Sequence, residues 1–389
     1  MAMMFGTAAL ILVLSVFNGF EGIVKSLYSS FYTDLKIFPS TGKVLTLTKD
    51  QYNQLTSING VRGISLVAEE KGIIQHAGTD RNDEEFNFQR AVTIKGVDQH
   101  YPKVAGVASH IIAGEFTTGN EEYPYIVLGS GVEDALQVDA EKNIFPLQVY
   151  LPKKGITELI DPSRNVSAAN INSSGVFAIQ PDFDNNYAIT NLDFVKLMLG
   201  MGENEYSGVE IAVEDGKSIS DVKSNIQKLF DGNYKVQNRF EQNLGLYSVM
   251  RTEKWVIYAV LVLIMFIFSF TIISALTMLV LEKQKDIGIL HALGGNKSFI
   301  QKIFLSEGLL IGIIGGVTGM LLALIIAWLQ VNYKLIPLQG GSFVIDYFPV
   351  KLRAEDFLLV AVTVLLIAIL ASWIPARKAA NQDLSLRSE

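Results

Sequence analysis

The longest apolar run without a charged residue, 255–281, sets the strongest limit on what this chain can fold into. As a helix that rises about 1.5 Å per residue, it is longer than the roughly 30 Å hydrocarbon core of a bilayer. Two further runs, 303–329 and 357–374, are also long enough to cross, and a fourth apolar stretch occupies 1–20. The sequence therefore predicts an α-helical membrane protein with four transmembrane helices.

The first apolar stretch differs from a secretory signal peptide. No basic residue precedes it, and no small-x-small cleavage pattern follows Phe20. We expect a retained helix, and its abrupt start predicts that the N-terminus is truncated.

Positive charge in the short segments predicts the orientation, because Lys and Arg resist translocation. Four lysines lie within 282–302 and three basic residues within 375–389, whereas the loop 331–356 carries three. The first two segments are therefore expected in the cytoplasm. The large domain between the first two helices is therefore expected outside the cytoplasm.

The residues between the first two helices have the composition of a water-soluble, acidic domain. The range 25–254 holds 30 acidic and 22 basic residues. Nucleic acid and anionic lipid headgroups require a concentrated positive surface, so we expect no nucleic-acid partner. The chain also has no cysteine, which excludes disulfides, thiolate metal sites and thiol nucleophiles.

Alternating and β-rich runs predict that this domain has an α+β fold made of two interleaved subdomains. Helical periodicity predicts helices at 50–58, 192–199 and 218–230. The predicted strands are 44–48, 64–68, 72–76, 88–94, 125–128, 147–151, 176–179, 187–190, 209–213 and 234–237.

No stretch of the sequence has the spacing of a nucleotide or metal site. Residues 294–298 come nearest to a phosphate-binding loop, but Asn296 stands where a Walker motif requires the glycine before its lysine. The four histidines lack metal-ligand spacing, and 182–186 lacks the glycine and closing glutamate of a calcium loop. We expect no catalytic residue, no metal and no cofactor.

Glycines recur at four-residue intervals in the third apolar run, where they allow helices to approach closely. We expect them to pack helices within the bundle, with dimerisation as the alternative. They are Gly308, Gly312, Gly315, Gly316 and Gly319.

Four segments resemble a known family. Residues 282–294 (EKQKDIGILHALG) and 303–312 (IFLSEGLLIG) resemble the signature of FtsX-like, MacB-type ABC transporter permeases. Residues 13–21 (VLSVFNGFE) and 375–380 (PARKAA) further resemble the LolC/LolE lipoprotein-releasing branch, although Asp383-Leu384 replaces the usual Asp-Pro. The resemblance spans the chain and implies a MacB-type periplasmic core domain. It also implies that the helices lie in the inner membrane of a bacterium, with the large domain in the periplasm.

The resemblance implies a non-catalytic permease subunit. A separate ABC ATPase subunit would bind ATP beneath two permease subunits, identical or homologous, and pass its closure through their helices to the outer domains. In the LolC/LolE branch a lipoprotein cargo is drawn from the membrane lipid and handed to a periplasmic lipoprotein carrier. A MacB-like efflux permease and an FtsX-like signalling subunit that regulates a cell-wall hydrolase remain alternatives.

Under this interpretation the chain divides into eight segments. The uninterrupted second helix is expected to project beyond the bilayer and to act as a lever. The segments are a first transmembrane helix (1–24), an extracytoplasmic α+β domain (25–245), a second transmembrane helix with an extracytoplasmic extension (246–281), a cytoplasmic coupling segment (282–302), a third transmembrane helix (303–330), a short extracytoplasmic loop (331–356), a fourth transmembrane helix (357–374) and a cytoplasmic tail (375–389).

The coupling segment is predicted to begin with a short helix that ends at Gly294-Gly295. The resemblance implies that this helix offers apolar side chains to a groove of the ATPase, whereas a solvated connecting loop is the alternative. The candidate ATPase-coupling residues are Lys285, Asp286, Ile287, Leu290, Leu293 and Gly294.

The range 153–174 is rich in turn-forming residues and is predicted to be a long loop between two strands. In the LolC/LolE branch a hook at this place engages the carrier, whereas a mobile excursion is the alternative. The implied carrier-docking contacts are the apolar Ile156, Leu159 and Ile160, flanked by Lys153, Lys154 and Arg164.

Overall fold

The computed structural model describes residues 1–79, 85–140, 146–154, 165–230, 234–338 and 347–381. Its contacts divide the chain into two compact units. The first, here called the membrane unit, comprises Met1–Val24 and Gly245–Glu389; the second, the core domain, comprises Lys25–Leu244.

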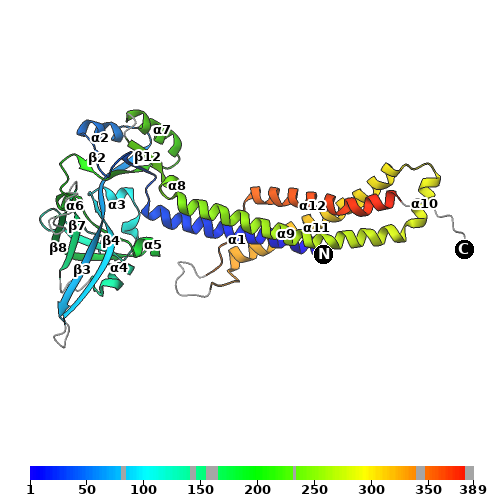
Figure 1. Cartoon of the computed structure of the whole chain (residues 1–389), viewed down its shortest axis with the longest axis horizontal. Coiled ribbons are helices and arrows are strands. Elements are labelled where there is room, and N and C mark those ends of the chain that lie inside the picture. The colour runs from blue at the N-terminus through cyan, green and yellow to red at the C-terminus, as the bar shows by residue number, and fades with distance from the viewer. Residues whose placement is uncertain (80–84, 141–145, 155–164, 231–233, 339–346, 382–389) are drawn as a thin grey trace. The chain divides into compact units, whose positions relative to one another are not determined.

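Within the described residues, four helices are long and apolar enough to cross a bilayer, which confirms the predicted number (Figure 1). A short helix, α10, lies between the second and third of them. The helices are α1 (Ala2–Phe31, whose last turns belong to the core domain), α9 (Leu244–Glu282), α10 (Gln284–Ala292), α11 (Lys297–Tyr333) and α12 (Ala354–Ala380).

Three of these helices extend clearly beyond their predicted limits. Helix α1 continues to Phe31, whereas its predicted end was residue 24. Helix α11 begins at Lys297 because Asn296 caps it, its Oδ1 accepting from the backbone N–H of Phe299 at 2.8 Å. Helix α12 continues through Pro375, where a tail was predicted. Its last turns are held by a buried cluster in which Ala376 and Ala379 pack with Val280, Ile300 and Phe304.

The glycine stripe of α11 lies at contacts with two neighbouring helices. A Cβ atom on Gly308, Gly312 or Gly316 would meet side-chain atoms of α12, and one on Gly315 or Gly319 would meet α1. All five glycines are buried. At Gly312 an added Cβ would lie 2.4 Å from Cβ of Ala368.

Replacing Gly312→Ala should therefore lower stability, although alanine favours helix more than glycine does. Overpacking of a close contact costs about 1–3 kcal/mol, so the melting temperature of the full chain in detergent should fall. The melting temperature can be followed by the fluorescence of Trp328 on α11 and Trp373 on α12. The control is Gly245→Ala, which has open space around the added methyl group and should not destabilise. An unchanged melting temperature for Gly312→Ala would show that the helices adjust freely.

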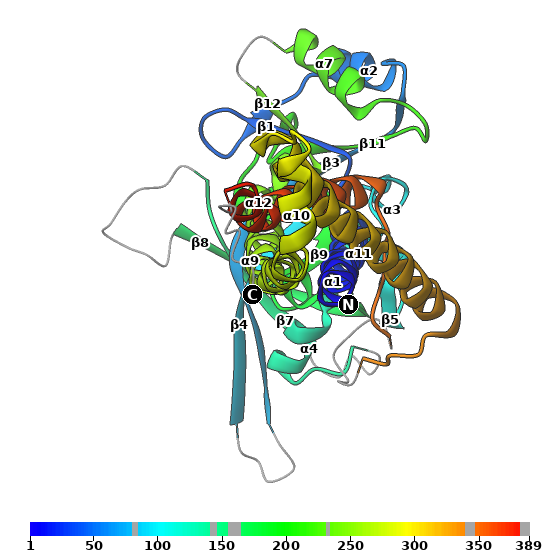
Figure 2. The same ribbon diagram turned by 90° about the vertical axis from the view of Figure 1, so that its right-hand side faces the viewer.

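The core domain is built on a ten-stranded mixed sheet with the order β12-β1-β11-β3-β4-β9-β6-β8-β5, while β7 pairs with β3 and β8. Figure 2 shows its long strand β4, which pairs with β3. β2 and β10 form a separate pair. The strands are β1 (Leu35–Pro39), β2 (Leu45–Thr46), β3 (Val61–Thr79), β4 (Glu85–Val97), β5 (Ile111–Gly114), β6 (Tyr125–Gly129), β7 (Leu147–Pro152), β8 (Val166–Phe177), β9 (Tyr187–Asn191), β10 (Glu205–Tyr206), β11 (Gly208–Val213) and β12 (Tyr234–Asn238).

Two hydrophobic clusters support this sheet. One lies under α2 and α7 and uses side chains of β1, β11 and β12; the other lies under α4 and α6 and uses β3, β4, β6 and β7. The helices of the core domain are α2 (Lys49–Thr56), α3 (Tyr101–Val104), η1 (Val107–His110), α4 (Ser130–Leu136), α5 (Pro181–Asp184), α6 (Leu192–Leu199), α7 (Ile219–Leu229) and α8 (Arg239–Gln242). The predicted α+β class is confirmed.

Three strand predictions need correction. The predicted strands 64–68 and 72–76 are parts of one long strand, β3, which continues from Val61 to Thr79. β1, β5 and the short β10 were not predicted. The loop predicted to reach Ser174 is wrong from Val166 onward, because β8 begins there and pairs with β7 and β6. Pairing on both sides overrides the low strand propensity of its Asn and Ser residues.

Candidate functional site

Helix α10 joins two membrane-spanning helices by a short, well-defined turn. Its C-terminal end is a Schellman motif: the N–H of Gly295 donates to the carbonyl of Leu290 at 2.8 Å, and the N–H of Gly294 donates to that of His291 at 3.0 Å. Gly294 has φ of +91°, a conformation that favours glycine. The prediction that Gly294-Gly295 ends a helix here is confirmed for Gln284–Ala292. The coupling role of this helix stays a prediction.

The burial of α10 changes which residues can serve as contacts. Ile287 was predicted to face a partner, but it is only 3% exposed and packs in the cluster formed by the ends of α9, α11 and α12. Leu290 is half-buried. The helix instead exposes Ile289 (59%) and Leu293 (80%), four residues apart and therefore on one face.

The charged residues of α10 lie beside this exposed apolar pair. Lys285 and Asp286 are both exposed, and Asp286 accepts from the ammonium group of Lys283 at 3.0 Å. The segment thus combines an exposed apolar pair with a fringe of charge. Such a surface suits a protein partner better than water.

A polar cluster joins three helices of the membrane unit, and the sequence did not predict it. Lys254 of α9 donates to Asp356 of α12 and to Asn18 of α1, each at 3.0 Å, and Asn18 donates to Asp356 at 2.5 Å. Asp356 is 4% exposed. The sequence places Lys254 and Asp356 at the ends of apolar runs, where they resemble ordinary flanking charges. Only the packing of the helices reveals that they meet.

The core domain contains a second buried set of charges, here called the ionic cluster: Lys36, Glu69, Lys95 and Glu210. Sheet register places Lys36 opposite Glu210 and Glu69 opposite Lys95. The ammonium nitrogen of Lys95 lies 2.7 Å from Glu210 and that of Lys36 lies 2.6 Å from Glu69. Lys95 also donates to the hydroxyl of Tyr101 at 3.3 Å.

The charges of this cluster stabilise one another. Burial alone would lower the pKa of Lys95, but the carboxylates of Glu210 and Glu69 raise it above its ordinary value. Burial alone would raise the pKa of Glu69, but the ammonium groups of Lys36 and Lys95 hold it below. Both groups are therefore charged at neutral pH. No signal in a single sequence could pair residues so far apart along the chain.

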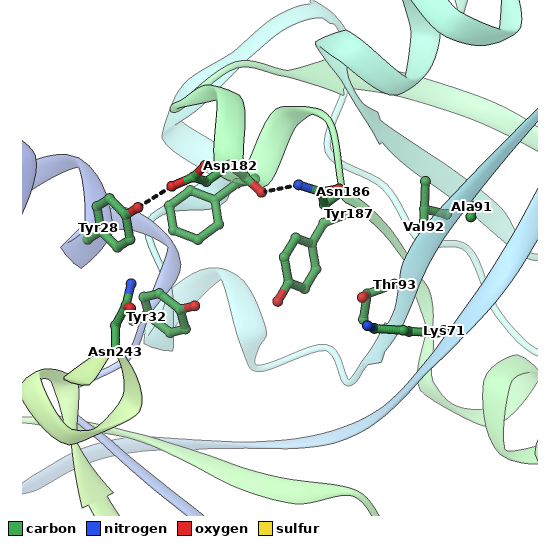
Figure 3. Close-up of a pocket in the computed structure, with 11 residues that line it drawn as sticks. Tyr28, Tyr32, Lys71, Ala91, Val92, Thr93, Asp182, Asn186, Tyr187 and Asn243 are labelled. Atoms are coloured by element: carbon green, nitrogen blue, oxygen red, sulfur yellow. Dashed lines mark hydrogen bonds between the residues drawn. The ribbon is translucent and has the colours of Figure 1, made fainter. Parts of the chain in front are cut away.

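A pocket of about 410 Å³ opens in the core domain beside aromatic side chains. Figure 3 shows Tyr28, Tyr32 and Tyr187 around it, with Lys71 and Thr93 on the side of Tyr187. The hydroxyl of Tyr28 donates to Asp182 at its rim. Burial, followed by the charge of Glu69, raises the pKa of Tyr187 to about 12, so its hydroxyl stays protonated. No group of His, Cys, Asp and Glu side chains suited to a metal ion occurs among the residues that the structure describes.

The predicted carrier-docking residues fall partly within the structure. Lys153 follows β7 and its N–H donates to the carbonyl of Asn165 at 2.8 Å. Lys154 is paired with Glu205 at 2.5 Å, so its charge is already compensated. The other four predicted residues, Ile156, Leu159, Ile160 and Arg164, lie outside the described residues.

Comparisons with known proteins cover both units. Residues 1–229 match the model of the MacB-like periplasmic core domain, and residues 258–384 match that of the FtsX-like permease C-terminal domain. The lipoprotein-releasing system transmembrane protein LolE of Haemophilus influenzae is 24% identical, covering 97% of this chain and 89% of its own length. LolC of Xylella fastidiosa is 27% identical over 76% of this chain and 79% of its own. The macrolide export ATP-binding/permease protein MacB of Neisseria gonorrhoeae is 23% identical over 97% of this chain but only 55% of its own length.

Proposed function

Because this chain belongs to the family of FtsX-like permeases that carry a MacB-like periplasmic core domain, we propose that it is a membrane subunit of an ABC transporter. The subunit works with a separate ATPase and a second permease, identical or homologous. Its cargo is a lipoprotein, which it releases from the outer leaflet of the inner membrane to a periplasmic carrier. The subunit itself catalyses no reaction, and ATP is bound by the partner.

The observation that carries the proposal is that both family models match in one chain. Relatives whose names describe lipoprotein release cover 76–97% of its length. Helix α10 adds a physical reason for a cytoplasmic partner, because it presents Ile289 and Leu293 to solvent between two spanning helices. In the proposed orientation this face meets the ATPase. Closure of the ATPase would then move α9 and α11, the two helices that α10 connects.

The test is a release assay with the full complex. The chain is purified from native membranes with the ATPase and permease that accompany it, and is reconstituted in vesicles with an N-acylated lipoprotein. We expect ATP-dependent transfer of that lipoprotein to soluble carrier, and no ATP hydrolysis by the chain alone. ATP turnover by the isolated chain that a mutation within it abolishes would overturn the proposal.

The same vesicles separate the alternative functions. ATP-dependent efflux of a macrolide without lipoprotein release would favour a MacB-like exporter, since MacB of Neisseria gonorrhoeae aligns with 97% of this chain. The absence of both activities, together with activation of an added cell-wall hydrolase, would favour a signalling subunit. Either result would overturn the lipoprotein assignment.

The proposal includes docking of the periplasmic carrier. We assign it to the segment that follows Lys153, because the pairing of β7 with β8 up to Pro152 and Val166 holds the two ends of this segment together. Exchange of 155–164 for a Gly-Ser linker should abolish carrier binding in the release assay while leaving ATP hydrolysis by the complex unchanged. Equal carrier capture by the exchanged chain would place docking elsewhere.

A further inference from the structure

Strand β4 has an open edge over most of its length. It pairs with β3 from Glu85 to Val97, but with β9 only from Thr93 to Val97. In the described part of the chain, residues 85–92 of β4 therefore have a strand partner on one side alone. The segment contains neither proline nor lysine, two residues that commonly protect such an edge.

The direction of the free backbone groups on this edge can be fixed. The N–H of Thr93 donates to the carbonyl of Asn186 at 2.7 Å, so it points toward the side of β9. Backbone groups of alternate residues in a strand point the same way. The N–H and C=O of Ala91 and Gln89 thus face the open edge, and none of them has a partner there within the described ranges.

The pocket described above lies at the end of this edge, because Ala91, Val92 and Thr93 of β4 form one of its walls. Figure 3 shows the hydroxyls of Tyr32 and Tyr187 pointing toward one another across it. On the β4 side the hydroxyl of Thr93 lies next to the ammonium group of Lys71.

The three hydroxyls and the ammonium group just named share one property. Within the part of the chain that the structure describes, none of these four groups makes a side-chain hydrogen bond or ion pair. All four can donate. The carboxylate of Asp182 at the rim already accepts from Tyr28. Three hydroxyls and one ammonium group that converge on a space of about 410 Å³ are complementary to a carboxylate.

We propose that the open edge of β4 and this pocket form one site for an extended, acidic segment of the cargo polypeptide. The main chain of the segment adds to β4 as a further strand, and a carboxylate side chain enters the pocket. The proposal rests on the proposed function, since it takes the cargo to be a polypeptide. Binding through main-chain atoms suits a transporter with varied cargo, because it depends little on sequence.

The direct test is peptide binding to the full chain in nanodiscs. The probe is a fluorescent ten-residue peptide of alternating Thr and Val with one central Asp. Gln89→Pro and Ala91→Pro each remove an outward N–H that the fold does not use, so the domain should still fold. We expect affinity to fall by about tenfold or more, whereas Gln89→Ala and Ala91→Ser should bind as the parent does. Undiminished binding by both proline variants would overturn strand addition.

The pocket is tested separately with Lys71→Met and Tyr187→Phe. Both variants should bind the Asp peptide no better than the parent binds the same peptide with Asn in place of Asp. Acetate at high concentration should compete with the Asp peptide only. If Asp and Asn peptides bind the parent equally, the carboxylate assignment is wrong. A photo-crosslinker at Gln89 that captures only a second copy of the chain would mean that the edge serves self-association.

Lipoprotein release separates this inference from the function on which it rests. If the parent releases lipoprotein and Gln89→Pro does not, while Gln89→Ala does, the edge belongs to the cargo path. If the parent and Gln89→Pro release equally well, the inference fails and the proposed function stands. If the parent releases no lipoprotein, the proposed function fails, and the edge then has no cargo to bind.

Discussion

Replacing Lys95→Met should destabilise the core domain more than any other single change considered in this unit. Lys95 is 2% exposed and is the nearest cation to Glu210, at 2.7 Å. The substitution leaves the carboxylate of Glu210 buried with only Lys36, 3.6 Å away, as a counter-charge. Breaking a buried pair in this way costs about 3–5 kcal/mol. At roughly 2–4 °C per kcal/mol for a domain of this size, the melting temperature should fall by roughly 6–20 °C.

The measurement is pulse proteolysis of the full chain in detergent. The three tryptophans, Trp255, Trp328 and Trp373, all lie in the membrane unit, so their fluorescence reports on that unit and should not change. The matched control is Lys43→Met, which breaks the exposed pair with Glu70 and should change stability by about 0–1 kcal/mol. Equal effects of the two substitutions would show that burial does not strengthen the ionic cluster.

The same cluster sets the pH range in which the core domain is stable. The pKa of Glu69 is held below its unfolded value of about 4.3. The contribution of Glu69 to the stability of the fold is therefore present above that pH and is lost as the pH falls below it. The pKa of Lys95 is raised above its unfolded value of about 10.4. The contribution of Lys95 to the stability of the fold is therefore present below that pH and is lost as the pH rises above it. In Lys95→Met the contribution of Lys95 should disappear, whereas that of Glu69 should only become smaller, because Lys36 remains 2.6 Å from its carboxylate.

The sequence was most informative where one physical signal acts locally. Length and apolarity identified all four spanning helices, and the capping and glycine signals located the end of α10. The limits of α11 and α12 were less accurate. Both helices extend past their apolar cores into polar residues, because Asn296 caps one and tertiary contacts of Ala376 and Ala379 hold the end of the other.

The sequence was least informative where side chains from distant segments meet. β8 has the composition of a turn, and only its pairing with β6 and β7 makes it a strand. Lys254 and Asp356 resemble two unrelated boundary charges until α9 and α12 pack. The pocket assembles Tyr32, Lys71 and Tyr187 from three separate elements, and no pattern along the chain links them.

Burial also corrects the choice of residues on the coupling helix. The family resemblance implied contacts through Ile287, Leu290 and Leu293, but Ile287 packs inside the membrane unit. An Asp at Ile287 would bury a charge and disrupt the helix ends, so it could not separate coupling from folding. Ile289 and Leu293 are the apolar residues of this helix that a partner can reach.

The double substitution Ile289→Asp and Leu293→Asp should disconnect the chain from its ATPase while leaving the fold intact. Burying one Ile or Leu contributes about 1.5–3 kcal/mol, so losing both should weaken ATPase binding by about a hundredfold or more, at 1.4 kcal/mol per tenfold. Co-purification with the ATPase and ATP-dependent lipoprotein release should both be lost. The melting temperature from tryptophan fluorescence should match that of the parent, because both side chains are exposed.

Two controls decide whether this effect belongs to the apolar face of α10. Gln284→Asp with Ser298→Asp adds the same charge to exposed polar positions of the same segment, and should keep both ATPase binding and release. Ile287→Ala should do the opposite: it creates a buried cavity, which costs about 2–5 kcal/mol, and lowers the melting temperature while the exposed face remains. If the charged control loses the ATPase as completely as Ile289→Asp with Leu293→Asp, then added charge rather than apolar contact governs binding, and α10 does not dock through these two side chains.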